Sequence, residues 1–398
     1  MAETTRLPFD RPGPLTPPPS LRRLQGEGPV HAIETAVGDP AWLVTGYAEV
    51  RRLLDDDRLG RSHREPERAS RTGESVLFGG PQGDFDTEWT DHRRMRSLLQ
   101  PHFSPRRMKA LRGRVETLTA GLLDELEAAG PVADLHARLA LPLPIAVICE
   151  LLGVPYEDRE RFRGWTQAAS DVTDRARSEQ GLAELFGYGQ RLVAAERAAR
   201  GPADEEAGGV IARLARTEGV SDDEAAAMGM FLLFAGHETT VVAIGMGVLW
   251  LLAHPGQWRA LADDPSRIDT AVEEILRAPG FGGRSGIPRY ARADFEVAGT
   301  KIREGDLVLL DIGAANHDPV GFDDPDRLDI ARRGPAHLGF GHGARYCIGA
   351  PLARIELSVV FAQLAARFPT LRLATAVEEL RFDQRTLTGG LTALPVTW

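Results

Sequence analysis

The stretch FGHGARYCIG, Phe340 to Gly349, sets Cys347, one of only two cysteines in the chain, among three glycines and ahead of an amphipathic segment. A thiolate is a competent nucleophile or metal ligand, and a helix N-terminus lowers the pKa of a thiol. Glycines carry no side chains, so a large flat ligand could approach this backbone, and Phe340 could cover one side of it. The other interpretation is a buried structural cysteine beside a glycine turn.

Composition narrows the class of protein. The 398 residues are 43% hydrophobic and carry a net charge of −10, which is typical of a globular chain and argues against general nucleic-acid binding. Two cysteines can build neither a disulfide framework nor a multi-cysteine zinc or iron–sulfur site. No signal peptide and no membrane-spanning run of about 20 apolar residues is evident. We therefore expect a cytoplasmic protein that uses no membrane.

The pattern along the chain predicts a mainly α protein with a minor β region. Residues 1–20 are proline-rich and should be extended, and residues 21–398 should form a single domain. A capping box at Ser221 predicts a long helix to Leu252 that is apolar almost all round and should run through the core. Residues 60–91 lose periodicity and are expected to form a long loop, which is often functional.

Several motifs together resemble the cytochrome P450 family. The cysteine stretch fits the family's haem-binding pattern of Phe, two residues, Gly, three residues, Cys, one residue and Gly. Three further segments resemble family motifs in the same chain order: AGHET at 235–239, EILR at 274–277 and FDDPDR at 322–327. The resemblance covers roughly residues 20–398. It implies the family's single-domain fold, with a long central helix over haem b (iron protoporphyrin IX) and Cys347 as the iron ligand.

In this resemblance AGHET is the oxygen-activating segment. Ala235 and Gly236 are small residues in a helix, where Gly costs about 1 kcal/mol relative to Ala, so close approach of a ligand would explain them. Glu238 and Thr239 supply an acid and an alcohol, which can relay the protons that dioxygen activation requires. The alternative for Thr239 is a hydroxyl that bonds only its own helix backbone. His237 is expected to be structural or hydrogen-bonding.

The resemblance also implies cofactor and structural residues. Haem propionates are anionic, and the matching cations are His92, Arg96, Arg289 and Arg345; a solvated surface charge is the alternative for each. The sequence departs from the family here, since FDTEWTDHRR replaces the common Asp-Pro-Pro-Glu-His. The remaining expected haem contacts are Phe340, Gly341 and Gly349. The expected structural residues are Glu274, Arg277 and Arg327, which in the family hold the meander against the haem-binding core.

A substrate pocket is expected beside the haem. Its predicted walls are the 60–91 loop and Phe231, Phe234, Phe281, Arg284, Ser285, Ile287 and Thr388. The segment FGGRSG at 281–286 is small enough to leave room for a bulky substrate, although it could be only a glycine-rich turn. Arg284 could meet a substrate carboxylate or hydroxyl, or be solvated. Cys149 lies in an apolar helix and is expected to pack in the core.

The sequence therefore predicts a haem-thiolate monooxygenase that hydroxylates or epoxidises a small molecule. Such a chain would take electrons from a ferredoxin and an NAD(P)H-dependent ferredoxin reductase, and we expect a monomer. The segment GIPRYAR and the tail GGLTALPVTW resemble actinomycete members of antibiotic pathways, especially macrolide oxidases. The basic stretch from His92 to Arg114 contains no Asp or Glu and could dock an acidic ferredoxin.

Three other functions remain open at this point. A peroxide-driven haem peroxygenase would normally lack the acid–alcohol pair. A non-catalytic haem-thiolate sensor would need neither a proton relay nor a large pocket. A haem-free cysteine hydrolase would need a histidine and an orienting group, which nothing in the sequence marks.

Overall fold

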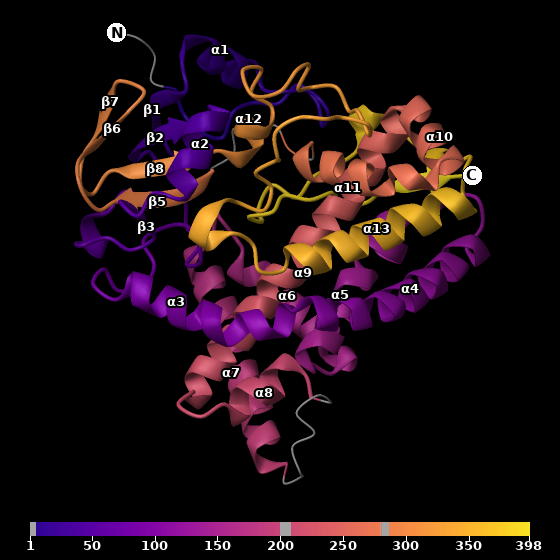
Figure 1. Cartoon of the computed structure of the whole chain (residues 1–398), viewed down its shortest axis with the longest axis horizontal. Coiled ribbons are helices and arrows are strands. Elements are labelled where there is room, and N and C mark those ends of the chain that lie inside the picture. Colours follow the sequence, from indigo (N-terminus) through magenta and orange to yellow (C-terminus); the bar gives the residue numbers. More distant parts are fainter. Residues whose placement is uncertain (1–4, 200–207, 279, 281–285) are drawn as a thin grey trace. The chain divides into compact units, whose positions relative to one another are not determined.

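The computed structural model describes residues 5–199, 208–278, 280 and 286–398, which form two compact units. Unit 1 comprises Met1–His92, Met246–Ala350 and Thr375–Leu380. Unit 2 comprises Arg93–Gly245, Pro351–Ala374 and Arg381–Trp398. The predicted mainly α architecture with a minor β part is confirmed (Figure 1).

The elements of unit 1 are α1 (Pro19–Glu27), α2 (Tyr47–Leu54), α10 (Pro255–Asp263), α11 (Ile268–Arg277), α12 (Ile312–Asn316), β1 (Val30–Glu34), β2 (Pro40–Val44), β3 (Leu59–Gly60), β5 (Ile287–Ala291), β6 (Phe295–Val297), β7 (Thr300–Ile302) and β8 (Leu307–Leu310). Those of unit 2 are α4 (Pro105–Ala128), α5 (Pro142–Leu152), α6 (Arg159–Ala169), α7 (Arg175–Ala198), α8 (Val210–Arg216), β4 (Ala133–Asp134), β9 (Arg372–Leu373) and β10 (Pro395–Thr397). Residues of both units occur in α3 (Glu88–Leu99), α9 (Asp222–Ala253) and α13 (Ala350–Arg367).

A five-stranded sheet of order β1-β2-β8-β5-β3 organises unit 1. β2 and β8 run parallel, and the other neighbours are antiparallel. All four residues of β8 are buried because both faces of the sheet are covered. Leu309 belongs to the cluster that includes Leu21 of α1, whereas Leu310 belongs to the cluster that includes Leu53 of α2. The alternation along β8 thus fixes the direction in which its neighbour β5 presents Arg289, which pairs with Val308.

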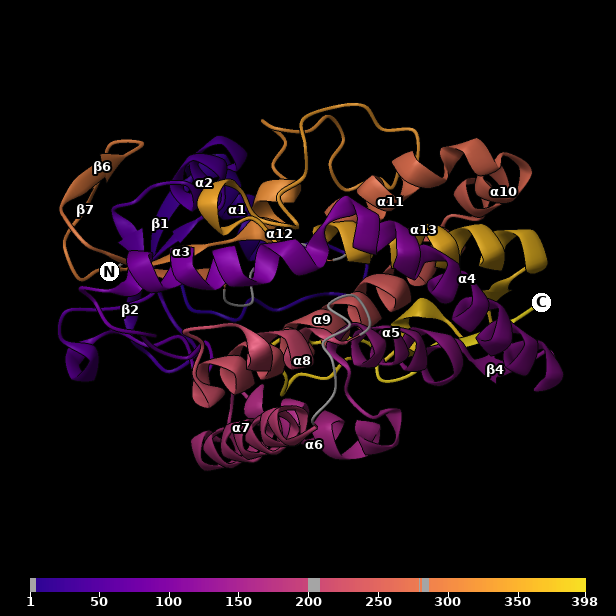
Figure 2. The same cartoon turned by 60° about the horizontal axis from the view of Figure 1, so that its bottom comes forward.

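The long helix α9 begins as the sequence predicts. The Ser221 hydroxyl accepts from the Glu224 backbone N–H at 3.2 Å, and the Glu224 carboxylate accepts from the Ser221 N–H at 3.0 Å, so the capping box is confirmed. By length and composition α9 could cross a membrane, but 72% of its most apolar window is buried inside the structure, as in a core helix. In unit 2, α6 and α7 lie side by side, joined by a short turn (Figure 2).

Two local expectations are corrected by the structure. The irregular segment ends earlier than predicted, because α3 begins at Glu88 rather than after Asp91. The alternating pattern of residues 295–311 predicts one small local sheet with turns at Gly299 and Gly305. The structure divides this sheet: β6 pairs only with β7, whereas β8 joins the five-stranded sheet between β2 and β5. Leu307–Leu310 is apolar throughout, and only the larger sheet can bury both of its faces.

Candidate functional site

The cysteine loop lies in unit 1 and uses its glycines for backbone shape. Gly341 and Gly343 have φ angles of 74° and 69°, which side-chain-bearing residues rarely adopt. A Cβ on Gly343 would fall on the carboxylate of Asp55. The Cys347 backbone N–H donates to the Phe340 carbonyl at 2.9 Å, which closes the loop and leaves the cysteine exposed, three residues before α13. The loop therefore presents a thiol outward from a tight, glycine-dependent turn.

A cluster of arginines lies in the same unit. Arg289 of β5 is only 8% exposed, and burial together with the charges of Arg345 and Arg61 lowers its pKa to about 9. Burial and Arg345 also lower the pKa of Arg61. Burial is the larger cause of both lowered pKa values, and the positive charge of Arg345 adds to it while Glu88 opposes it.

Glu88 is the carboxylate within this cluster. It accepts from the Arg61 N–H at 2.7 Å and from the Ser62 N–H at 3.0 Å, and it pairs with Arg345 and, at 3.3 Å, with Arg292. Burial raises the pKa of Glu88, but the hydrogen bonds from Ser62 and Arg61 and the charge of Arg345 bring it below its ordinary value. Four arginines around one carboxylate leave an excess of positive charge that suits a dianionic ligand.

The expected propionate residues divide between the units. Arg289 and Arg345 belong to the arginine cluster, and Arg345 also lies over the Trp89 ring at 4.5 Å. His92, at the end of unit 1, meets the same ring edge-on at a centroid distance of 6.3 Å. Arg96 follows on α3 within unit 2. Trp89, which stands where the family commonly has proline, thus supports two of the predicted cations.

The structural ion pair of unit 1 needs one correction. Glu274 and Arg277 form the predicted pair, with a distance of 2.7 Å from Nε to Oε2, and both are buried. The third member is Arg332, whose Nε lies 3.1 Å from both Glu274 oxygens. Arg327 contributes its backbone carbonyl to Arg332, while its side chain is 59% exposed and pairs with Asp324. The loop path turns the Arg327 side chain to the surface.

The predicted acid–alcohol pair lies on α9 within unit 2. Burial raises the pKa of Glu238 to about 7; a hydrogen bond from Thr388 opposes the rise, the charge of Asp383 adds to it, and Arg163 opposes it. Such a carboxyl can both give and accept a proton near neutral pH. The Thr239 hydroxyl is exposed and donates to the Ala235 carbonyl at 3.0 Å. The backbone-bonded alternative is therefore realised, and it leaves the Thr239 oxygen able to accept a second hydrogen bond.

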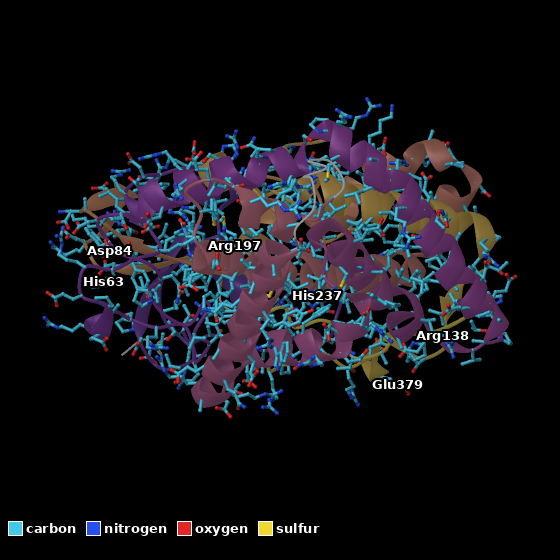
Figure 3. The ribbon with its side chains drawn as sticks, turned by 90° about the horizontal axis from the view of Figure 1, so that it is seen from below. His63, Asp84, Arg138, Arg197, His237 and Glu379 are labelled. Atoms are coloured by element: carbon cyan, nitrogen blue, oxygen red, sulfur yellow. The ribbon has the colours of Figure 1, made fainter. Side chains whose placement is uncertain are left out.

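The neighbours of this pair are structural. A Cβ on Gly236 would lie 2.6 Å from Cδ1 of Ile148 on α5, so this glycine makes room for helix packing, and its expected contact with haem stays a prediction. His237 is fully buried (Figure 3) and its Nδ1 lies 2.6 Å from the Leu233 carbonyl, as a hydrogen-bonding role predicts. Cys149 packs in the core as expected, and burial raises the pKa of its thiol to about 12.

The predicted pocket residues have mixed surroundings. Phe231 is 39% exposed on α9, whereas Phe234 is buried. Ile287 begins β5 opposite Leu310, and Thr388 contacts Glu238. Three further members lie outside the described residues: Phe281, Arg284 and Ser285.

Sequence reasoning missed Arg61, Glu88 and Arg332. Glu88 had a visible signal, because it precedes His92 by four residues in the segment that departs from the family pattern. Arg332 had only its position shortly after the meander motif. Arg61 had none, because its surroundings come from distant segments.

Comparison with known proteins agrees with this geometry. A model of the Cytochrome P450 family matches residues 267–390. The chain is 44% identical to pentalenolactone synthase of Streptomyces exfoliatus, over 100% of both chains. It is 36% identical to mycinamicin IV hydroxylase/epoxidase of Micromonospora griseorubida, over 100% of this chain and 99% of that protein. The crystal structure of PimD, a polyene macrolide pimaricin epoxidase, superposes with a TM-score of 0.87 at 38% identity over 100% of both chains.

The chain belongs to the cytochrome P450 family. It is a haem-dependent monooxygenase with haem b as cofactor, and its substrate is a small molecule. The residues of unit 1 fit that cofactor, because they combine an outward cysteine on a glycine turn with an arginine cluster in need of anions.

Proposed function

We propose that Cys347 ligates the haem iron and that Arg289, Arg345 and His92, with Arg96, hold the propionates. The observation that carries this proposal is the excess positive charge around Arg289, which an anion would neutralise. Phe340, Gly341 and Gly349 would contact the macrocycle. Haem supplies the chemistry by which one oxygen atom of dioxygen enters a C–H or C=C bond while the other leaves as water.

Glu238 and Thr239 deliver the protons that this reaction consumes. A carboxyl whose pKa lies near 7 is present in both protonation states at neutral pH, so it can pass protons in either direction. Thr239 is exposed on α9, and its oxygen can accept a hydrogen bond from water.

The substrate is a secondary metabolite such as a macrolide intermediate. Support comes from the relatives, which include mycinamicin IV hydroxylase/epoxidase and a pimaricin epoxidase. Phe231, which is 39% exposed on α9, would offer such a substrate an apolar contact.

The reaction needs electrons from outside the chain. A ferredoxin, reduced by an NAD(P)H-dependent reductase, supplies them in the cytoplasm, and the enzyme acts as a monomer. Residues 21–398 work as one catalytic domain. A peroxide-driven peroxygenase is the second candidate, and the acid–alcohol pair favours the monooxygenase.

A screen followed by isotope labelling tests this function. Macrolide and other secondary-metabolite pathway intermediates are added to the ferric enzyme, and those that shift the haem spectrum are incubated with ferredoxin, reductase, NADPH and ¹⁸O-labelled dioxygen. The expected product carries one labelled oxygen. Product that forms with hydrogen peroxide but not with the electron chain would favour the peroxygenase, and spectral binding without either reaction would favour a sensor.

A further inference from the structure

The C-terminal segment 381–392 forms a hairpin that packs on the acid of the acid–alcohol pair. Its two arms are joined by hydrogen bonds from the Asp383 N–H to the Gly390 carbonyl at 2.9 Å and from the Thr392 N–H to the Arg381 carbonyl at 3.0 Å. Near its tip, the Thr388 hydroxyl donates to Oε2 of Glu238 at 3.4 Å. Both residues belong to unit 2, so the contact lies within one compact body.

The hairpin meets one face of α9. Glu238, Val242 and Gly245 are spaced by four and three residues and so share a helix face. A Cβ on Gly390 would lie 2.7 Å from Cγ2 of Val242, and a Cβ on Gly245 would lie 3.7 Å from Cδ1 of Leu391. The hairpin therefore approaches this helix face so closely that Gly390 has no room for a side chain.

The other side of the hairpin is fixed to the turn between α6 and α7. The Val172 N–H donates to the Arg385 carbonyl at 2.9 Å, and the Leu387 N–H donates to the Ser170 carbonyl at 3.1 Å. The Arg385 guanidinium also pairs with the buried carboxylate of Asp171 at 3.0 Å. Thr388 is thus the next residue after an anchored segment, which holds its backbone beside Glu238.

We propose that Thr388 is a positioning residue that orients the Glu238 carboxyl and sets its proton affinity. This inference rests on the proposed role of Glu238 in proton delivery. Two charged groups also change the pKa of Glu238: Asp383 of the hairpin raises it, and Arg163 of α6 lowers it. Thr388 differs from both because it touches the carboxyl through a hydrogen bond and is held in place by backbone contacts.

The test follows the protonated Glu238 carboxyl directly in the haem-loaded enzyme. Its C=O stretching band is recorded by infrared difference spectroscopy from pH 5 to pH 9 and assigned by its loss in Glu238→Gln. Wild type should titrate near pH 7. Thr388→Val should raise the midpoint by about half to one pH unit, because a hydrogen bond to the ionised form is lost. Thr388→Ser should restore the wild-type midpoint.

Two further variants separate positioning from a general effect on the hairpin. Gly390→Ala should raise the midpoint although Thr388 is intact, because the added methyl group pushes the hairpin away from Val242. Thr392→Val should leave it unchanged, because the Thr392 hydroxyl is exposed and bonds only the Arg381 carbonyl, at 3.3 Å. An unchanged midpoint in Thr388→Val overturns the inference, since a merely structural threonine would change stability and not this titration.

A different result would contradict the proposed role of Glu238 in proton delivery. If Glu238→Gln leaves the ratio of product to NADPH at the wild-type value, Glu238 does not deliver protons. Even then, the shift of the titration midpoint in Thr388→Val still tests whether Thr388 positions the Glu238 carboxyl. If Glu238→Gln uncouples NADPH use from product while Thr388→Val changes neither the midpoint nor the pH profile of coupling, only the inference about Thr388 is wrong.

Discussion

Cys347 and Cys149 carry the same thiol in opposite surroundings. Cys347 is exposed on its glycine turn, whereas Cys149 is buried and burial holds the pKa of its thiol near 12. Burial therefore disfavours the thiolate form of Cys149. We expect Cys347→Ser to abolish the red-shifted absorption band of the reduced carbon monoxide complex and Cys149→Ser to keep it. Loss of the band in Cys149→Ser alone, with the fold intact by circular dichroism, would contradict the assignment.

Thr239 combines a backbone hydrogen bond with exposure on an apolar helix. Thr239→Ala removes the oxygen that can accept a proton-carrying water but leaves the helix hydrogen bonds in place. We expect haem content to be unchanged and hydrogen peroxide per NADPH to rise several-fold, because the loss of a proton-transfer group slows proton delivery. Peroxide assay alongside NADPH consumption measures this ratio. Wild-type coupling in the variant would show that another group relays the protons.

For single residues, the sequence predicts the local motifs but not the residues from distant segments that contact them. Glu238 and Thr239 follow from five consecutive residues, and both lie on α9 as expected. The partner of Glu274 depends on how the meander loop turns, and the loop directs Arg332 rather than Arg327 inward. The neighbour that Gly236 faces depends on how α9 is rotated about its axis. Because this helix is apolar on nearly every side, the sequence could not predict that Gly236 packs against Ile148.

Among the helices, α13 carries an unusual buried acid. Glu356 is 1% exposed, its Oε2 has no hydrogen-bond partner in the described structure, and burial raises its pKa from 4.5 to about 8. Because the folded-state pKa lies above the unfolded value, the folded chain holds this proton more tightly. The stability that this provides is complete below about pH 4.5 and is lost as the pH rises toward about 8.

Glu356→Gln should remove that pH dependence. Between those two pH values, the free energy of unfolding of wild type should fall relative to the variant by about 1.4 kcal/mol per pH unit. Urea denaturation at pH 6, 7 and 8 measures the difference, with Glu184→Gln as the control, because Glu184 is exposed on α7. Parallel curves for wild type and Glu356→Gln would show that the carboxyl is not buried as the structure has it.

The hydrophobic periodicity predicts which segments form helices and strands, but it does not predict which strands pair. The capping box located the start of α9 within one residue, since its bonds are local. The same kind of reasoning kept β8 with its sequence neighbours β6 and β7, because strand pairing is decided by the burial of distant segments such as β2.

For the whole molecule, the basic stretch from His92 to Arg114 is where we expect an acidic ferredoxin to dock. The structure pairs some of its arginines with acids of unit 2: Arg94 with Glu224, Arg112 with Glu116 and Arg114 with Glu150. Lys109 is exposed on α4 and is the better probe.

Lys109→Glu should slow reduction by ferredoxin about two- to tenfold at low salt, because opposite charges mainly raise the encounter rate. Stopped-flow reduction under carbon monoxide measures the rate. The difference from wild type should shrink as salt screens the charges. Lys301→Glu on β7, which lies outside the segment, is the matched control. Equal rates for wild type and Lys109→Glu at every salt concentration would place the docking surface elsewhere.

The arginine cluster of unit 1 also bears on how the newly made chain matures. Arg61, Arg289 and Arg345 repel one another, and Glu88 neutralises only part of their charge. Sodium chloride should therefore raise the melting temperature of the haem-free protein, by screening this repulsion, and raise that of the loaded protein much less. A ligand that binds only the folded state stabilises it by mass action. In the cell, the supply of prosthetic group would then set how much of this polypeptide escapes proteolysis, so that haem synthesis and enzyme abundance rise and fall together.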